Sequence, residues 1–172
     1  MPPPPLNEWH EFFTVLGGTA AALIGAMFVV VSIGVGVLSV DRGGAIRAFI
    51  SATVSHLSTA LFASLVVMVP GLDWLWLGVI IGLAGIAGLA YAARVVTGFR
   101  QHDGTVGSDW FWYAIVPPLG YAAFLVAGVT AVLRVAWSLD LLAAAALLLL
   151  AVGIRNGWDM IVFLVTRDRS ST

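Results

Sequence analysis

Five long and almost uninterrupted apolar runs divide this chain of 172 residues. The runs cover residues 12–37, 45–69, 74–97, 110–133 and 139–165. A helix needs about 20 mostly apolar residues to cross the hydrocarbon layer of a bilayer, and each run has that length. A strand of a membrane barrel would instead alternate apolar and polar residues over about ten positions. The runs therefore predict an all-α, polytopic transmembrane helical bundle with five spans, in a single domain that covers residues 1–172.

The composition excludes the common classes of soluble protein. Apolar residues make up 60% of the chain and charged residues only 10%, whereas soluble domains have about 45–50% and about 25%. The absence of cysteine excludes disulfides, thiol nucleophiles and thiolate metal sites. The net charge is −1 and the cations are scattered, so no basic groove for a nucleic acid is expected. The expected environment is a lipid bilayer.

The arginines predict an orientation in the membrane. With five spans, six of them fall on one side of the bilayer, namely Arg42, Arg47, Arg94, Arg100, Arg167 and Arg169. Cytoplasmic loops are enriched in basic residues, so we expect the N-terminus outside and the C-terminus inside. All eight basic residues are arginine, which we interpret as the coding bias of a GC-rich bacterial genome. The predicted location is the bacterial inner (plasma) membrane.

Small residues mark helix-packing faces in two runs. Lipid provides no hydrophobic reason for helices to associate, so small side chains must let backbones approach. In the first run these are Gly17, Ala21 and Gly25, and in the third they are Gly78, Gly82, Gly85 and Gly88. We expect both faces to pack within the chain rather than between subunits. Helix starts are predicted by the capping residues Asn7, Asp73 and Ser138.

The second run is the most polar of the five. One side of its helix carries Arg47, Ser51, Ser55, Ser58 and Thr59, with His56 at the edge. The opposite side carries Ile50, Val54, Leu57 and Leu61. We expect this apolar side to face lipid and the polar side to face other helices or a path for water.

Ionisable and helix-breaking residues gather at one predicted depth. With a rise of about 1.5 Å per residue, His56, Pro117 and Asp159 all lie about 12–13 Å from the inner ends of their helices. A polar layer is therefore expected across the inner half of the bundle. Its candidate residues are Ser55, His56, Thr59, Tyr113, Pro117, Pro118, Tyr121, Arg155, Asn156 and Asp159.

The chemistry of this layer follows from spacing. Arg155 and Asp159 are four residues apart, so they share a helix face and are expected to form an ion pair. The two prolines remove two backbone donors and free the carbonyls of Tyr113 and Ala114, which then need a side chain, a water or an ion. His56 could donate to one of them. The layer is either a structural polar clasp or a hydrated path or binding site, and intramembrane ionisable residues favour the second interpretation.

Glu8, His10 and Glu11 cluster at the predicted outer mouth. Carboxylates near a helix N-terminus are stabilised without a metal, so no metal site is predicted there. A haem between helices would need two deep histidines, and only His56 qualifies. No Ser/His/Asp arrangement sits in a recognisable motif, so we predict no cofactor and no catalytic residue, and an enzyme is the less favoured class.

Two segments carry a resemblance. They are Trp9–Phe13 followed by the stretch GGTAAALIGAMFVVV, and the segment Gly153–Asp159 near the end of the chain. Together they resemble small multispanning bacterial integral membrane proteins of unassigned function. The resemblance implies a bacterial membrane protein and no particular activity.

The function predicted from these observations is an oligomeric membrane channel or transport protein, with its polar layer in the inner half of the bundle. Five helices hardly enclose a wide path alone, and symmetric copies of a chain are the usual solution, so a homo-oligomer that moves a small ion or solute is expected. The alternative is a non-catalytic accessory or assembly subunit of a larger membrane complex. A third interpretation is an intramembrane enzyme that uses His56 and Asp159.

Overall fold

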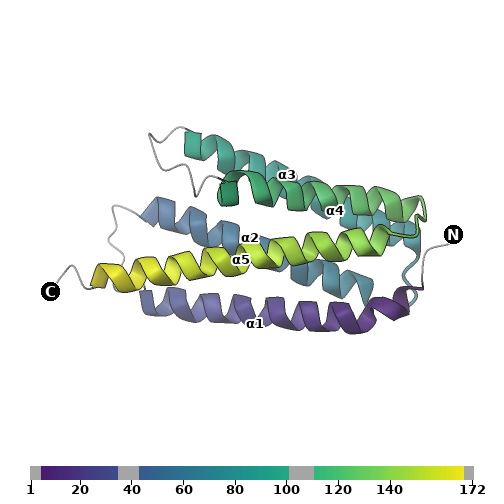
Figure 1. Ribbon diagram of the computed structural model, residues 1–172, viewed down its shortest axis with the longest axis horizontal. Coiled ribbons are helices and arrows are strands. Elements are labelled where there is room, and N and C mark those ends of the chain that lie inside the picture. The colour runs from purple at the N-terminus through teal and green to yellow at the C-terminus, as the bar shows by residue number, and fades with distance from the viewer. Residues whose placement is uncertain (1–4, 35–42, 101–110, 169–172) are drawn as a thin grey trace.

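Five α-helices lie side by side in an elongated bundle (Figure 1). The computed structural model describes residues 5–34, 43–100 and 111–168. The helices are α1 (His10–Gly34), α2 (Gly43–Val67), α3 (Trp74–Arg100), α4 (Val116–Val132) and α5 (Ser138–Asp168). A 3₁₀ turn, Leu6–Trp9, precedes α1, and a π-helical turn, Phe111–Ile115, precedes α4. The predicted all-α class with five helices is confirmed for the described residues.

Three helical segments among the described residues are long and apolar enough to cross a membrane. They are Leu6–Ser32, Trp74–Val95 and Ser138–Val162. The apolar parts of the other two helices, Ser51–Val67 and Val116–Val132, are shorter. Large apolar side chains cover the outside of the bundle, as at Val15, where the exposed fraction is 70%. The fold is therefore that of a multi-pass membrane protein whose helices contact lipid.

The bundle consists of two hairpins and a central helix. α1 pairs with α2 and α3 pairs with α4, and α5 packs between the two hairpins against α4, α2 and, less extensively, α1. Helices that are consecutive in the sequence run in opposite directions, as the colours of Figure 1 show. α2 and α3 contact each other only sparsely. The junction of α2, α4 and α5 is therefore the part of the interior that lies between the two hairpins.

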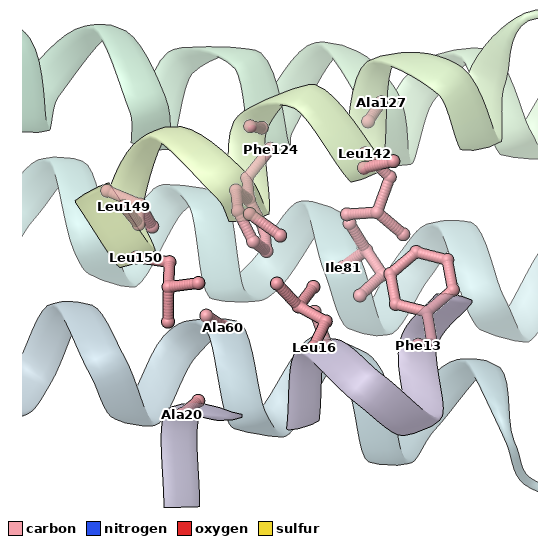
Figure 2. Close-up of a cluster of buried hydrophobic side chains, with 14 of the residues drawn as sticks. Phe13, Leu16, Ala20, Ala60, Ile81, Phe124, Ala127, Leu142, Leu149 and Leu150 are labelled. Carbon is pink, nitrogen blue, oxygen red and sulfur yellow. The ribbon is translucent and has the colours of Figure 1, made fainter. Parts of the chain in front are cut away.

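The hydrophobic core draws on all five helices (Figure 2). Phe13 and Leu16 of α1, Ile81 of α3, Phe124 of α4 and Leu149 of α5 belong to this core. Each of these side chains is at most 3% exposed. Apolar packing of this kind gives many weak dispersion contacts per side chain, and it closes the middle of the bundle.

Glycines let α3 and α4 approach closely, as the sequence predicts. We define the α3 seam as the four residues Gly78, Gly82, Gly85 and Gly88. A Cβ added at the first would lie 2.5 Å from the carbonyl oxygen of Gly128, and one added at the last would overlap the ring of Tyr121. Small residues that allow backbone contact are the usual basis of helix association in membranes. The prediction of intramolecular packing is confirmed for this seam.

The first helix behaves differently from the prediction. Gly17 packs on α2, where an added Cβ would lie 3.0 Å from Cβ of Ser64. Ala21 is exposed, and a Cβ added at Gly25 would have no neighbour within 4 Å. The predicted intramolecular face therefore holds only at its first residue. We define the α1 seam as Gly18, Ala22 and Gly25, which are all exposed on one side of α1.

The predicted orientation of α2 is wrong. Leu57, which was expected to face lipid, is 1% exposed and packs where Gly153 of α5 leaves room for its side chain. Ser51 and Ser58, which were expected to face other helices, are exposed. The physical reason is shape, because a leucine side chain fills the space over a glycine and a serine does not. The outer face of α2 therefore carries Ser51 and Ser58, whereas Ser64 is buried.

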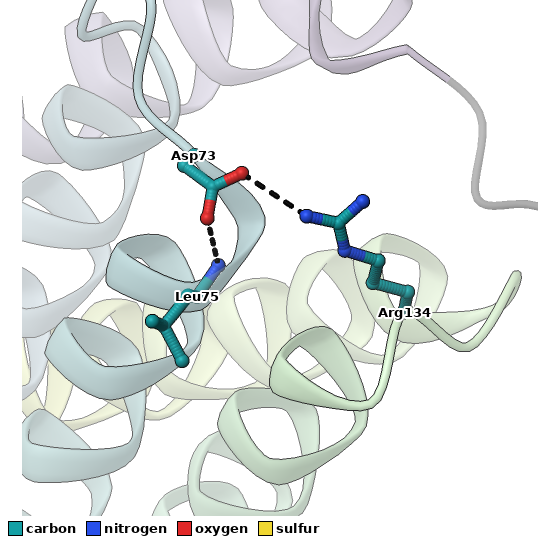
Figure 3. Close-up of polar contacts among 3 residues, drawn as sticks. All are labelled: Asp73, Leu75 and Arg134. Atoms are coloured by element: carbon teal, nitrogen blue, oxygen red, sulfur yellow. Dashed lines mark hydrogen bonds and ion pairs between the residues drawn. The ribbon is translucent and has the colours of Figure 1, made fainter.

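The ends of the helices follow local rules in part. Asp73 caps α3 as predicted, because its Oδ2 accepts a hydrogen bond of 3.0 Å from the N–H of Leu75 (Figure 3). Its Oδ1 lies 3.3 Å from Nη2 of Arg134, which ties the α2–α3 loop to the α4–α5 loop at the same end of the bundle. Both side chains are more than half exposed, so this ion pair adds little stability.

Two predicted caps differ from the structure. Asn7 lies inside the 3₁₀ turn, where its backbone carbonyl accepts the N–H of His10, and Ser138 is the first residue of α5 rather than its cap. The fourth helix was expected from residue 110, and the described helical segment begins at Phe111 with the π-helical turn and continues as α4 from Val116. Pro117 and the residue after it have no N–H, so regular α-helical hydrogen bonding cannot continue across this point.

Candidate functional site

A buried hydrogen bond joins α2 to α4 in the interior of the bundle. Nδ1 of His56 lies 2.8 Å from the hydroxyl oxygen of Tyr121, and the two side chains are 4% and 1% exposed. Thr59, three residues further along α2, is half-buried, and its hydroxyl donates a hydrogen bond of 2.8 Å to the backbone carbonyl of Ser55. Two of the predicted polar-layer residues, from different helices, are therefore brought together.

The hydrogen bond between His56 and Tyr121 can run in either direction. In one histidine tautomer Nδ1 carries the hydrogen and donates to the Tyr121 hydroxyl, and in the other the hydroxyl donates to Nδ1. In both cases the hydrogen bond joins α2 to α4 inside the bundle.

Gly88 of α3 positions Tyr121 of α4. Because Gly88 has no side chain, the Tyr121 ring can lie directly on the α3 backbone. From there its hydroxyl reaches across to α2. The sequence predicts Gly88 as a packing residue and Tyr121 as a polar-layer residue. In the structure, the absence of a side chain at Gly88 allows the Tyr121 hydroxyl to reach His56.

Asn156 is a buried polar residue of α5. It is 1% exposed, and among the described residues its Oδ1 accepts no hydrogen bond. Its neighbours on α5 show that this face points inward, since Gly153 receives Leu57 of α2 and a Cβ at Gly157 would lie 3.2 Å from the sulfur of Met27. An amide oxygen buried in this way is costly without a donor.

Arg155 and Asp159 form the predicted ion pair, but at the edge of the bundle. Nε of Arg155 lies 3.9 Å from Oδ2 of Asp159, and the side chains are 38% and 37% exposed. The guanidinium also lies 4.8 Å from the ring centre of Trp112, an arrangement that stabilises a cation through the ring quadrupole. The predicted layer is thus divided into an interior cluster and an edge pair.

The remaining candidates have simpler surroundings. Pro117 is buried, Pro118 and Ser55 are half-buried, and the side chain of Tyr113 lies outside the described residues. At the other end, Glu8 and Glu11 are exposed and His10 is half-buried. Within the described ranges, no group of three or more His, Cys, Asp or Glu side chains is placed to hold a metal ion.

Sequence reasoning missed three residues near these groups. Thr53 of α2 is fully buried, and it lies on the same helix face as Leu57, one turn away. Trp112 contacts Arg155, and the hydroxyl of Tyr91 in α3 lies 3.4 Å from Oγ of Ser51. Only the register between helices could have found these contacts, because each pair lies far apart in the sequence.

The long apolar helices of this chain are consistent with a small multi-span membrane protein. Comparison with protein families, with curated proteins and with solved structures found no match to this chain.

Proposed function

We propose that this chain is an oligomeric channel or transport protein for a small ion or solute in the bacterial inner membrane. The observation that carries the proposal is the polar outer face of α2. Ser51 and Ser58 are exposed and Ser55 is half-buried, and the Tyr91 hydroxyl approaches the same face from α3. A helix face that met only lipid would be expected to be apolar, so these hydroxyls favour contact with water.

The path is proposed to lie between copies of the chain. Within one chain the interior is filled, because Leu57 packs over Gly153 and Leu149 packs over Gly120. Closed symmetric assemblies are the common form of homo-oligomers. The exposed α1 seam supports such an assembly, since small residues let helices of neighbouring subunits approach.

The outer face of α2 changes character along its length. After the serines it continues with Phe62 and Leu65, whose side chains are 44% and 57% exposed. Hydrophobic constrictions can close a channel by excluding water. We assign the serine half of the face to a hydrated vestibule and the Phe62 level to the barrier.

The proposed topology has five spans, with the N-terminus outside and the C-terminus inside. The distribution of arginines supports it, because six of the eight then lie on the cytoplasmic side. α2 runs from that side towards the outside, so the serine half would open to the cytoplasm and Phe62 would lie beyond it.

The test is ion flux in liposomes that contain only the purified protein. We expect flux of K⁺, Na⁺ or Cl⁻ above that of empty liposomes, and a rate several-fold higher for Phe62→Ser, because a hydroxyl hydrates the barrier. The control is Leu147→Ser on α5, which is 46% exposed on another face and should leave the rate unchanged.

Three results would count against the proposal. Absence of flux for all three ions would overturn the channel. Equal rates for the native protein and Phe62→Ser would remove α2 from the path. A different protein that co-purifies in fixed stoichiometry, together with absence of flux, would favour the accessory subunit instead.

A further inference from the structure

A buried acceptor on α5 needs a donor. Oδ1 of Asn156 accepts no hydrogen bond within the described part of the chain, and the residue is 1% exposed. A buried polar atom without a partner is strongly unfavourable, and inside a bilayer no bulk solvent is available to provide one. Oγ of Ser138 is also a buried oxygen of α5 without a described hydrogen-bond partner, but Ser138 lies at the opposite end of the helix.

A second acceptor lies in the π-helical turn ahead of α4. The carbonyl of Tyr113 would normally accept a hydrogen bond from the N–H four residues later, or five residues later in a π-helix. Those positions are Pro117 and Pro118, and neither has an N–H. This carbonyl is therefore released from both kinds of helical hydrogen bond.

The register of α4 and α5 places the two acceptors at one level. Leu149 packs over Gly120, and Asn156 is seven residues later on the same face of α5. Because the helices are antiparallel, that level lies about seven residues before Gly120 in the chain, within the π-helical turn that contains Tyr113. The Arg155 guanidinium lies 4.8 Å from the ring centre of Trp112, and each of these residues adjoins one of the two acceptors, so α5 and the π-helical turn are close together at this level.

We infer that this junction binds a water molecule that donates one hydrogen bond to Oδ1 of Asn156 and one to the carbonyl of Tyr113. Two acceptors cannot satisfy each other, whereas water has two hydrogens and is commonly held by two to four polar partners in protein interiors. Thr53 is fully buried on the same face of α2 as Leu57, one turn before the contact of Leu57 with Gly153. The inference does not depend on the proposed function.

The first test is the sign of a change in thermal stability. If water links the two oxygens, Asn156→Leu leaves the Tyr113 carbonyl without a donor, and the apparent melting temperature in detergent should fall by about 2–4 °C. If the junction is dry, the same substitution removes an unpaired acceptor and should raise the melting temperature. A rise would overturn the inference.

The second test is a double-mutant cycle. Pro117→Ala supplies the missing N–H to the Tyr113 carbonyl, so in that background Asn156→Leu should lower the melting temperature much less. Additive effects would show that the two residues do not share a ligand. The matched control is Ser138→Ala, which also removes a buried oxygen without a described partner and should be additive with Pro117→Ala.

A density map of the native protein in lipid provides a direct test that needs no variant. At a resolution that shows ordered water elsewhere, we expect a peak within hydrogen-bonding distance of both oxygens. A map with ordered waters elsewhere but no peak at this junction would overturn the inference, even if a variant failed to fold.

Discussion

The α3 seam and the α1 seam have a similar spacing of small residues and opposite surroundings. On α3, added Cβ atoms at Gly78, Gly85 and Gly88 would collide with α4. On α1, added Cβ atoms at Gly18 and Gly25 would meet nothing within 4 Å. A stripe of small residues therefore permits close packing without producing it. The helix that fills the α3 seam is supplied by the next segment of the chain, whereas α1 has only α2 and part of α5 as neighbours.

The largest effect on the free energy of unfolding is expected at Gly88, the last residue of the α3 seam. Gly88→Ala would drive the Tyr121 ring away from α3 and break its hydrogen bond to His56, so overpacking and the lost bond together should reduce the free energy of unfolding by about 2–4 kcal/mol. Equilibrium unfolding in mixed micelles measures this. The control is Gly82→Ala, whose Cβ would lie 4.0 Å from Cα of Gly128 and should be tolerated. Equal losses would show that the seam is not tight at Gly88.

An intermediate effect is expected where α1 meets α2. Gly17→Ala would place its Cβ 3.0 Å from Cβ of Ser64, so the helices must separate by a few tenths of an ångström, at a cost of about 1 kcal/mol. The next residue is a matched control, because Gly18→Ala points into open space and should leave the free energy of unfolding unchanged or slightly higher. If the two variants behaved alike, the described contact between α1 and α2 would be wrong.

The smallest effect on folding is expected in the α1 seam, whose residues are exposed. Gly25→Leu should change the free energy of unfolding of one chain by less than about 0.5 kcal/mol, as is usual for surface substitutions. If neighbouring subunits pack against the α1 seam, the same variant should shift the protein towards monomer in native mass spectrometry. An unchanged oligomer would exclude this seam as the subunit interface and would leave the outer face of α2 as the contact to examine.

Local rules made several features predictable from the sequence. The length of the apolar runs predicted the five helices, and the position of Asp73 before a run predicted the cap of α3. The i, i+4 spacing of Arg155 and Asp159 predicted their ion pair. Each of these depends on residues that are close in the sequence, so no knowledge of helix packing was required.

The sequence by itself determined that this chain forms five apolar helices and which stretches of the chain they occupy. Only the tertiary structure decided which face of each helix is inside, and therefore that Leu57 points inward, that His56 meets Tyr121 and that Asn156 is buried. In a soluble protein a polar face indicates the outside. In a membrane bundle both the lipid face and the core are apolar, so association depends on the fit of side chains over small residues, and that fit exists only once the helices are in register.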